Sequence, residues 1–279
     1  MNTKKIFAIL MAALLACTLI SCKKDDDTAT DDENNNNVGE EMVYENFTYD
    51  VSGEGTYEIT GYTYVGTELQ DVVVPSEIGG REVTGIGDDA FKAIKTIKTV
   101  TIPASITYIG QYAFYDCDEI TAITIPDTVT SIGIGAFENC DKLASVTLPA
   151  GLKTIENYTF KACKALTGVT LPETLEEIGA AAFWGCEALT EITVPESVKD
   201  MGDAAFYECA ALTKATVLGE ALGKTEEDEE GKKTEHTIGE IVFNSCAADL
   251  MITVTEGTEF AKYAEENNYN VTFATASAQ

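Results

Sequence analysis

The stretch IGQYAFYDCDEITAITIP, residues 109–126, decides the fold, because its outline returns along most of the chain. Each copy places an Ile-Gly pair, then Ala-Phe, then a cysteine, then a short β-branched run that a proline ends. A fixed period of this size is typical of a solenoid, in which each unit buries its apolar face against its neighbours. The period therefore argues against two separate globular domains in this 279-residue chain. The prolines spaced by 23 residues are Pro103, Pro126, Pro149, Pro172 and Pro195, and Pro75 precedes them after a longer unit of 28 residues that contains GGREV.

Two apolar columns predict the core of this solenoid. A phenylalanine recurs once in each unit, and an isoleucine precedes it by five residues in most units. Burial of one such side chain contributes roughly 1.5–3 kcal/mol, so a stacked column of them is the main expected source of stability. The phenylalanine column contains Phe91, Phe114, Phe137, Phe160, Phe183, Phe206 and Phe243. The isoleucine column contains Ile86, Ile109, Ile132, Ile155 and Ile178, continued by Met201 and Ile238.

A glycine follows this isoleucine column in most units. Such a column indicates either a turn with positive φ or a close approach of two backbones. Glu156 occupies the position in one unit, which argues against a strict need for positive φ there. The glycines are Gly87, Gly110, Gly133, Gly179, Gly202 and Gly239.

The run before each proline alternates as a β-strand does. In ITAITI, residues 120–125, Ile123 and Ile125 are expected to point inward, and Ala122 and Thr124 outward. Proline ends the strand because it has no N–H to donate. The outward threonines form a candidate ligand-binding face, although threonine is also simply well suited to an exposed strand. This candidate strand face contains Thr101, Thr124, Thr147, Thr170, Thr193 and Thr216.

Aromatic residues gather beside the phenylalanine column and form a second candidate surface. Trp184 and Tyr207 occupy the same position in adjacent units, so we expect them to be neighbours on one edge. An exposed aromatic pair can anchor a protein or stack on a sugar ring. The alternative is that these rings pack over their own turns, and both interpretations stay open here. The candidate ligand-contact edge contains Tyr112, Tyr115, Tyr158, Trp184 and Tyr207.

The cysteines of the units are predicted to be small buried thiols. Parallel stacking holds equivalent Cβ atoms at the rung spacing of about 4.8 Å, whereas a disulfide needs roughly 3.5–4.5 Å. No Cys-x-x-Cys pair occurs, and the single histidine, His236, lies in a charged segment, so we predict no metal site and no cofactor. The six are Cys117, Cys140, Cys163, Cys186, Cys209 and Cys246.

The chain begins with an export signal. Lys4 and Lys5 precede an apolar run that is too short to span a membrane. LISC at residues 19–22 is similar to the lipobox of bacterial lipoproteins, which implies a signal peptide at 1–21 and lipid attachment at Cys22. The competing LLAC, ending at Cys17, would leave an apolar mature start and is the weaker alternative. Membrane contact is therefore expected through the N-terminal lipid only.

The segment 22–42 is predicted to be an acidic tether, because it has too few apolar residues to bury. A lysine followed by acidic residues resembles the signal that sends some lipoproteins to the outer face of the outer membrane. The predicted localisation is the bacterial outer membrane, at the cell surface, with a periplasm-facing orientation as the alternative. A spacer without address content is the simpler interpretation of the same residues.

The remaining boundaries follow from pattern changes. Residues 43–74 alternate and turn, and are expected to form an N-terminal β cap. The solenoid is expected over 75–254, interrupted by a charged surface loop at 219–237. Residues 255–279 are expected to form a C-terminal cap with a short helix and a closing strand.

Composition excludes several classes of function. A formal net charge of -29 and a pI near 4.1 argue against nucleic-acid binding, which needs a basic surface. The sequence contains no Ser-His-Asp arrangement and no phosphate-binding glycine loop, and paired acids such as Glu176 and Glu177 fall at outward repeat positions. We therefore predict that the protein is not an enzyme.

The L-x-x-I-x-I run, its proline and the IGxxAFxxC block resemble the BspA-type leucine-rich repeat of bacterial surface lipoproteins. The resemblance covers about residues 75–218, with a degenerate unit at 238–254. It implies a β-rich (α+β) repeat solenoid, a right-handed leucine-rich-repeat superhelix with 23-residue units. It also implies an adhesion module that binds a protein or glycan, since similar repeats have been linked to attachment. The alternative is a structural or accessory lipoprotein of an envelope or nutrient-capture assembly.

Overall fold

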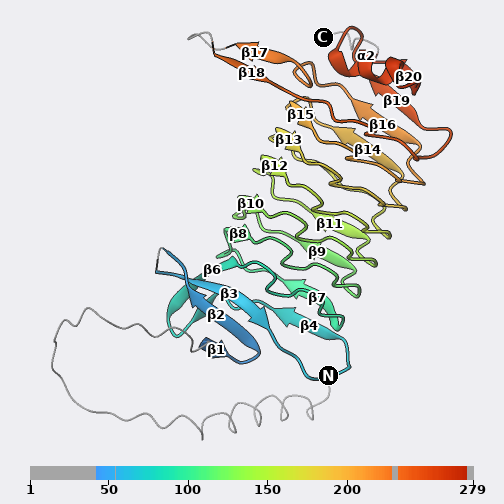
Figure 1. Ribbon diagram of the computed structural model, residues 1–279. Helices are drawn as coiled ribbons and strands as arrows, with labels where there is room; N and C mark the ends of the chain where they lie inside the picture. The colour runs from blue at the N-terminus through green and yellow to red at the C-terminus, as the bar shows by residue number, and fades with distance from the viewer. Residues whose placement is uncertain (1–41, 54, 228–231, 275–279) are drawn as a thin grey trace, which may run out of the picture. The chain divides into compact units, whose positions relative to one another are not determined.

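The computed structural model describes residues 42–53, 55–227 and 232–274 (Figure 1). The predicted signal peptide, Cys22 and all of the predicted tether except Met42 lie outside these residues. Within the described ranges, no helix is both long enough and apolar enough to cross a membrane.

The described chain is a β-solenoid with the predicted 23-residue period, in which equivalent strands of successive coils lie side by side (Figure 1). Two parallel ladders run along the coils. The first, which we call the strand face, contains β4 (Gln70–Val73), β7 (Ile97–Thr101), β9 (Ala122–Thr124), β11 (Ser145–Thr147), β14 (Glu191–Val194), β16 (Lys214–Val217), β19 (Met251–Val254) and β20 (Asn270–Phe273). The second contains β6 (Arg81–Ile86), β8 (Tyr108–Ile109), β10 (Ser131–Ile132), β12 (Thr154–Ile155), β13 (Glu177–Ile178) and β15 (Asp200–Met201).

The extra residues of the first, longer unit form a hairpin. The strand β5 (Glu77–Ile78) pairs antiparallel with β6. Gly79 and Gly80, which connect the two strands, both have positive φ. Two consecutive positive φ angles are what a two-residue hairpin turn of type I′ requires, and glycine adopts them without steric cost.

The predicted phenylalanine column forms a continuous stack of buried rings. Neighbouring rings from Phe91 to Phe243 lie 4.9 to 5.5 Å apart between centroids and are nearly parallel, with interplanar angles of 2° to 17°. The stack ends against Tyr62 on one side and against the edges of Phe260 and Tyr269 on the other. The terminal aromatic residues therefore close the core where the repeat stops.

The glycine column reflects close approach rather than positive φ. A Cβ atom at Gly110 would lie 2.5 Å from the backbone nitrogen of Asp88 in the preceding coil, and one at Gly202 would lie 2.3 Å from that of Ala180. Positive φ occurs elsewhere in each coil, for example at Tyr112 (53°) and at Asp116 (62°), directly before the cysteine. The positive-φ interpretation was wrong for this column, because the turns that close the coil lie further along the chain.

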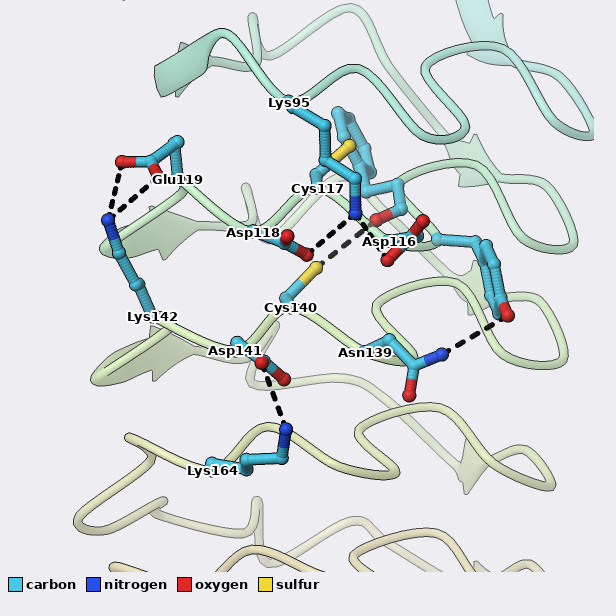
Figure 2. A network of polar contacts seen from close by, with 12 residues as sticks. Lys95, Asp116, Cys117, Asp118, Glu119, Asn139, Cys140, Asp141, Lys142 and Lys164 are labelled. Atoms are coloured by element: carbon cyan, nitrogen blue, oxygen red, sulfur yellow. Dashed lines mark hydrogen bonds and ion pairs between the residues drawn. The ribbon is translucent and has the colours of Figure 1, made fainter.

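The repeat cysteines are free thiols that cap the phenylalanine carbonyls of the preceding coil. The Sγ of Cys140 donates a hydrogen bond to the carbonyl oxygen of Phe114 at 3.1 Å, as Figure 2 shows. The same contact recurs at 3.0 to 3.2 Å along the column, from Cys117 to Cys246. A small, weakly polar side chain at this position both fills the core and satisfies a buried acceptor.

The N-terminal end contains β1 (Met42–Tyr44), β2 (Phe47–Val51) and β3 (Tyr57–Tyr62), joined as an antiparallel meander. The second half of the segment 43–74, which we expected to belong to the β cap, is already part of the repeat ladders. The strand β3 already pairs in parallel with β6, and β4 pairs with β7. Ladder pairing therefore begins before Pro75, and only β1 and β2 stand outside the repeat pattern.

The C-terminal end contains the expected short helix and closing strand. Thr258 is the N-cap residue of helix α2 (Glu259–Glu266). Its Oγ1 accepts a hydrogen bond from the N–H of Ala261 at 3.1 Å. This contact satisfies one of the free N–H groups of the first turn. The strand β20 then pairs in parallel with β19 and ends the strand face.

The described parts of the segment 219–237, residues 219–227 and 232–237, include two short strands. These strands, β17 (Thr225–Glu227) and β18 (Lys233–Glu235), form an antiparallel hairpin. His236, which follows the hairpin, has a side chain that is only 9% exposed, and its Nδ1 lies 2.7 Å from the Asp200 carboxylate. The histidine therefore contributes to attachment of the insertion to the coil that contains β15.

Truncation of a ring in the middle of the phenylalanine stack should strongly destabilise the fold. Phe137→Ala is expected to lower the free energy of unfolding by about 3–5 kcal/mol, because the cavity cannot close between two stacked rings. Phe273→Ala is the matched control, since this ring is 46% exposed, and its loss should cost far less. Urea unfolding followed by circular dichroism measures both, and equal losses for the two variants would contradict this account of the core.

The buried thiols should make the fold sensitive to alkali. Burial raises the pKa of Cys186 to about 12, whereas an unfolded cysteine titrates near 8.5. The folded chain therefore keeps its proton while the unfolded chain loses it, so stability is full below about pH 8.5 and declines as the pH rises toward 12. At pH 10 one such thiol should cost about 2 kcal/mol.

Urea midpoints measured from pH 7 to pH 10 test this expectation. The wild-type midpoint should fall over this range, and Cys186→Ala, although less stable at pH 7, should show a shallower fall. Parallel pH profiles for the two proteins would show that the thiol does not carry the effect.

Candidate binding surfaces

The structure places all six predicted threonines of the strand face in one outward row. Thr124 pairs with Thr147 and Thr193 with Thr216, in parallel register. All are exposed except Thr216, which is half-buried. The row also continues beyond the prediction through Thr253 and Thr272, whose hydroxyls lie 3.2 Å apart. Sequence reasoning missed these two because no proline follows them at the repeat position.

A second outward column runs beside the threonine row and has charges at several positions. Asp71 accepts a hydrogen bond from the Thr99 hydroxyl at 2.6 Å. Further along, Lys214 lies 3.5 Å from Glu191, and both side chains are largely exposed. Between them the column holds Ala122, Ser145 and Gly168. The middle of the strand face is therefore low in relief and uncharged in this column.

Three shallow hollows lie on the strand face, each between the strands of two neighbouring coils. The first, of about 490 Å³, is lined by residues of β7 and β9. The second, of about 390 Å³, lies between β11 and Thr170, and the third, of about 260 Å³, lies between Thr170 and β14. Threonines of the outward row and prolines that end the strands line all three. The threonine row therefore includes concave places as well as a flat surface.

The predicted aromatic residues do lie along one edge, but they contact each other and their neighbours. The rings of Trp184 and Tyr207 meet edge to face at 5.1 Å, and the Trp184 Nε1 donates a hydrogen bond to Glu208 at 2.9 Å. The Lys161 ammonium lies over the rings of Tyr158 and Trp184, at 5.1 and 5.6 Å. This group spans three coils and is held by cation–π and aromatic contacts.

Tyr112 and Tyr115 form a second aromatic group nearer the N-terminus. Their rings meet edge to face at 5.8 Å, and the Lys92 ammonium lies within 5.6 Å of both ring centres. The Tyr115 hydroxyl also accepts a hydrogen bond from the Asn139 side chain at 3.1 Å (Figure 2). Packing of the turns over their own units accounts for these rings. Among the predicted aromatic residues, Tyr158 is the most open, at 37% exposed.

Lysines and acids of neighbouring coils form ion pairs at the repeat spacing. Figure 2 shows Lys142 against Glu119 at 2.7 Å and Lys164 against Asp141 at 2.9 Å. The Asp141 carboxylate raises the pKa of Lys164 through this hydrogen bond. The sequence contains the signal for these pairs, since each lysine follows its acid by 23 residues. Because these lysines are engaged within the solenoid, they leave unpaired acids elsewhere on its surface.

Within the part of the chain that the structure describes, no three histidine, cysteine or acidic side chains gather in a way that could hold a metal ion. The predicted lipid attachment residue, Cys22, lies outside that part.

Comparison with known families settles the fold family. The model of the BspA type leucine-rich repeat region matches residues 57–169 and 84–213, in six copies, which together span more than half of the chain. The chain belongs to this family. The match begins at β3, in agreement with the ladder pairing of that strand.

Solved structures of leucine-rich repeat proteins from bacteria have the same fold. A leucine-rich cell surface protein of Faecalibacterium prausnitzii aligns with a TM-score of 0.60 at 22% identity, over 78% of this chain and 71% of that one. A leucine-rich repeat protein of Eubacterium ventriosum aligns with a TM-score of 0.54 at 24% identity, over 72% of this chain and 50% of that one. At these identities the likeness extends to the fold alone. The comparison with curated proteins gave no match.

Trp184 is the one tryptophan of the sequence, so its fluorescence reports directly on the aromatic edge. Tyr207→Ala should expose the indole, shift its emission to longer wavelength and lower stability by about 0.5–1.5 kcal/mol through loss of the edge-to-face contact. Tyr115→Ala, in the other aromatic group, should leave the emission unchanged. Identical spectra for wild type and Tyr207→Ala would contradict the packed arrangement of this edge.

Proposed function

We propose that the protein is a cell-surface recognition module whose strand face binds a protein or glycan partner. The threonine row carries this proposal, because it is exposed from Thr101 to Thr193, crosses successive coils and borders three hollows. A stacked solenoid holds such a surface rigid, so binding costs little conformational entropy in the protein itself. We propose no catalytic role for it, and no cofactor.

The aromatic edge is the weaker of the two candidate surfaces. Its rings and hydroxyls are already in contact with lysine, asparagine and glutamate side chains of the same solenoid. A ligand at this edge would have to compete with those contacts. The strand face has no such internal partners over most of its length, which favours it as the binding surface.

Surface location is also part of the proposal. The predicted lipid on Cys22 and the acidic tether would anchor the module, and the Faecalibacterium prausnitzii protein with the same fold is described as a cell surface protein. The acidic composition favours partners with cationic patches and disfavours nucleic acid. Addition of protease to intact cells tests the location: cleavage supports it, whereas protection would favour the periplasm-facing envelope role.

A binding screen against matrix proteins and a glycan array tests the proposed surface. For any ligand found, the double variant Thr124→Tyr, Thr193→Tyr should weaken binding about tenfold or more, equivalent to at least about 1.4 kcal/mol, because it blocks the threonine row. The double variant Trp184→Ala, Tyr207→Ala, which removes the aromatic pair, should leave the affinity nearly unchanged. Trp184 fluorescence should also be unaffected by the ligand, and strong quenching would place the ligand at the aromatic edge instead.

A further inference from the structure

The three hollows coincide with the three places where the ladder of the strand face is interrupted in the described chain. Within the same residues, the second ladder is interrupted once, between β10 and β12. Strand pairing joins β4 to β7, β9 to β11, and β14 through β20 without a break. Among the described residues, no strand pairing joins β7 to β9. Residues 168–171, which follow β11 along the strand face, are joined to β11 by a single bridge between Ser145 and Gly168. No strand pairing in the described chain joins these residues to β14. We call these places the first gap (β7 and β9), the second gap (β11 and 168–171) and the third gap (168–171 and β14).

The second and third gaps flank one coil that departs from the repeat consensus. This coil has Glu156 in the glycine column and the fully buried Thr159 in the alanine column before Phe160. At the glycine positions from Gly110 to Gly239, a Cβ atom would come within 2.2–2.6 Å of the preceding backbone. Among the described residues, no strand pairing joins β10 to β12, the strand that ends directly before Glu156. The ring of Phe160 lies 5.5 Å from both of its neighbours, whereas Phe91 and Phe114, beside the first gap, lie 4.9 Å apart, so ring spacing does not account for the first gap.

Negative charge is concentrated at these two gaps. Glu173 lines both hollows, and Glu191 lines the third gap. In the described chain, Glu173 has neither a hydrogen-bond nor an ion-pair partner, while Glu191 has only the exposed contact with Lys214. The first gap differs, since no charged side chain lines it. Peptide groups that lack a ladder partner in the gaps add further polar atoms that need hydrogen bonds.

We propose that the second and third gaps together form a site for an arginine or lysine side chain presented by an extended segment of a protein partner. The carboxylates of Glu173 and Glu191 supply the counter-charge, and the methyl groups of Thr147, Thr170 and Thr193 contact the aliphatic stem. This inference rests on the proposed function of the strand face and names the class of ligand that the face would bind.

The lining favours a protein segment over a sugar. Carbohydrate sites typically use an exposed aromatic ring as a stacking platform, and no aromatic residue lines either hollow. The aromatic side chains of this solenoid lie on a different edge, where they contact each other and lysines. A long cationic side chain, with an apolar stem and a charged end, fits a hollow of apolar and hydroxyl groups with carboxylates at its rim.

The test uses the full chain and fluorescein-labelled nonapeptides of alternating threonine and valine, with arginine at the centre. A matched peptide carries citrulline, which has nearly the same shape as arginine but no charge. Fluorescence polarisation should show the arginine peptide binding at least about tenfold tighter than the citrulline peptide, a difference of about 1.4 kcal/mol. Absence of binding, or equal binding of the two peptides, would overturn the proposal.

Variants then assign the charge and the gap separately. Glu173→Gln should remove most of the preference for arginine, whereas Glu196→Gln should leave it unchanged, because Glu196 occupies the same turn position one coil later, beside the unbroken ladder. The double variant Glu156→Gly, Thr159→Ala restores the consensus in this coil and should weaken arginine binding while every strand-face carboxylate stays in place. A preference for arginine that survives Glu173→Gln, or that is lost equally in Glu196→Gln, would overturn the assignment.

The two proposals fail in different ways. If a partner from the binding screen is lost in the Thr124→Tyr, Thr193→Tyr variant but is unaffected by Glu173→Gln combined with Glu191→Gln, the strand face still binds and the cation site is wrong. If the strand-face variant itself has no effect on the partner, the proposed function is wrong.

Discussion

Parallel stacking of coils in a fixed 23-residue register is the constraint on which the rest of the structure depends. Each side chain lies beside its counterpart in the next coil, so a residue type that suits this contact is kept in every unit. Phenylalanine rings stack face to face, thiols reach the carbonyl of the preceding coil, and lysines meet acids one coil away. The fold is therefore stabilised by repeated neighbour contacts rather than by one central core.

This constraint explains which features the sequence could predict. The proline spacing establishes the period, and the alternation in ITAITI correctly assigns Ile123 and Ile125 to the interior. Of the two explanations for the glycine column, close approach is confirmed and positive φ is wrong, because the tight turns use other residues, such as Tyr112 and Asp116. The hairpin of β17 and β18 was missed because its strands are acidic and show no apolar alternation. The hairpin lies outside the repeat register. Positive φ does recur every 23 residues, as at Asp116 and Asn139, but it falls on residue types that give no glycine signal.

For the candidate surfaces too, the sequence could predict some features and not others. The sequence places the threonine row outward and the aromatic residues on one edge, but it could not decide whether the rings were free. That depends on what lies one coil away: Lys161 falls between Tyr158 and Trp184, and Asn139 reaches Tyr115. Stacking therefore uses the aromatic edge for internal contacts, while threonine, with a short side chain pointing to solvent, stays available along the strand face.

In a repeat protein, a distinct site can arise at a coil whose residues depart from the consensus. Coils with glycine and alanine at their close-approach positions stack tightly and continue the ladder from β14 to β16, although the first gap also lies between two such coils. Glu156 and Thr159 add volume at those two positions, and the neighbouring rings lie slightly further apart on both sides. The phenylalanine stack accommodates this change, since the Phe160 ring stays stacked on both neighbours at 5.5 Å, with interplanar angles of 4° and 17°. The coil that departs from the consensus thus lies between the two hollows that Glu173 lines, and the solenoid continues without disruption on both sides.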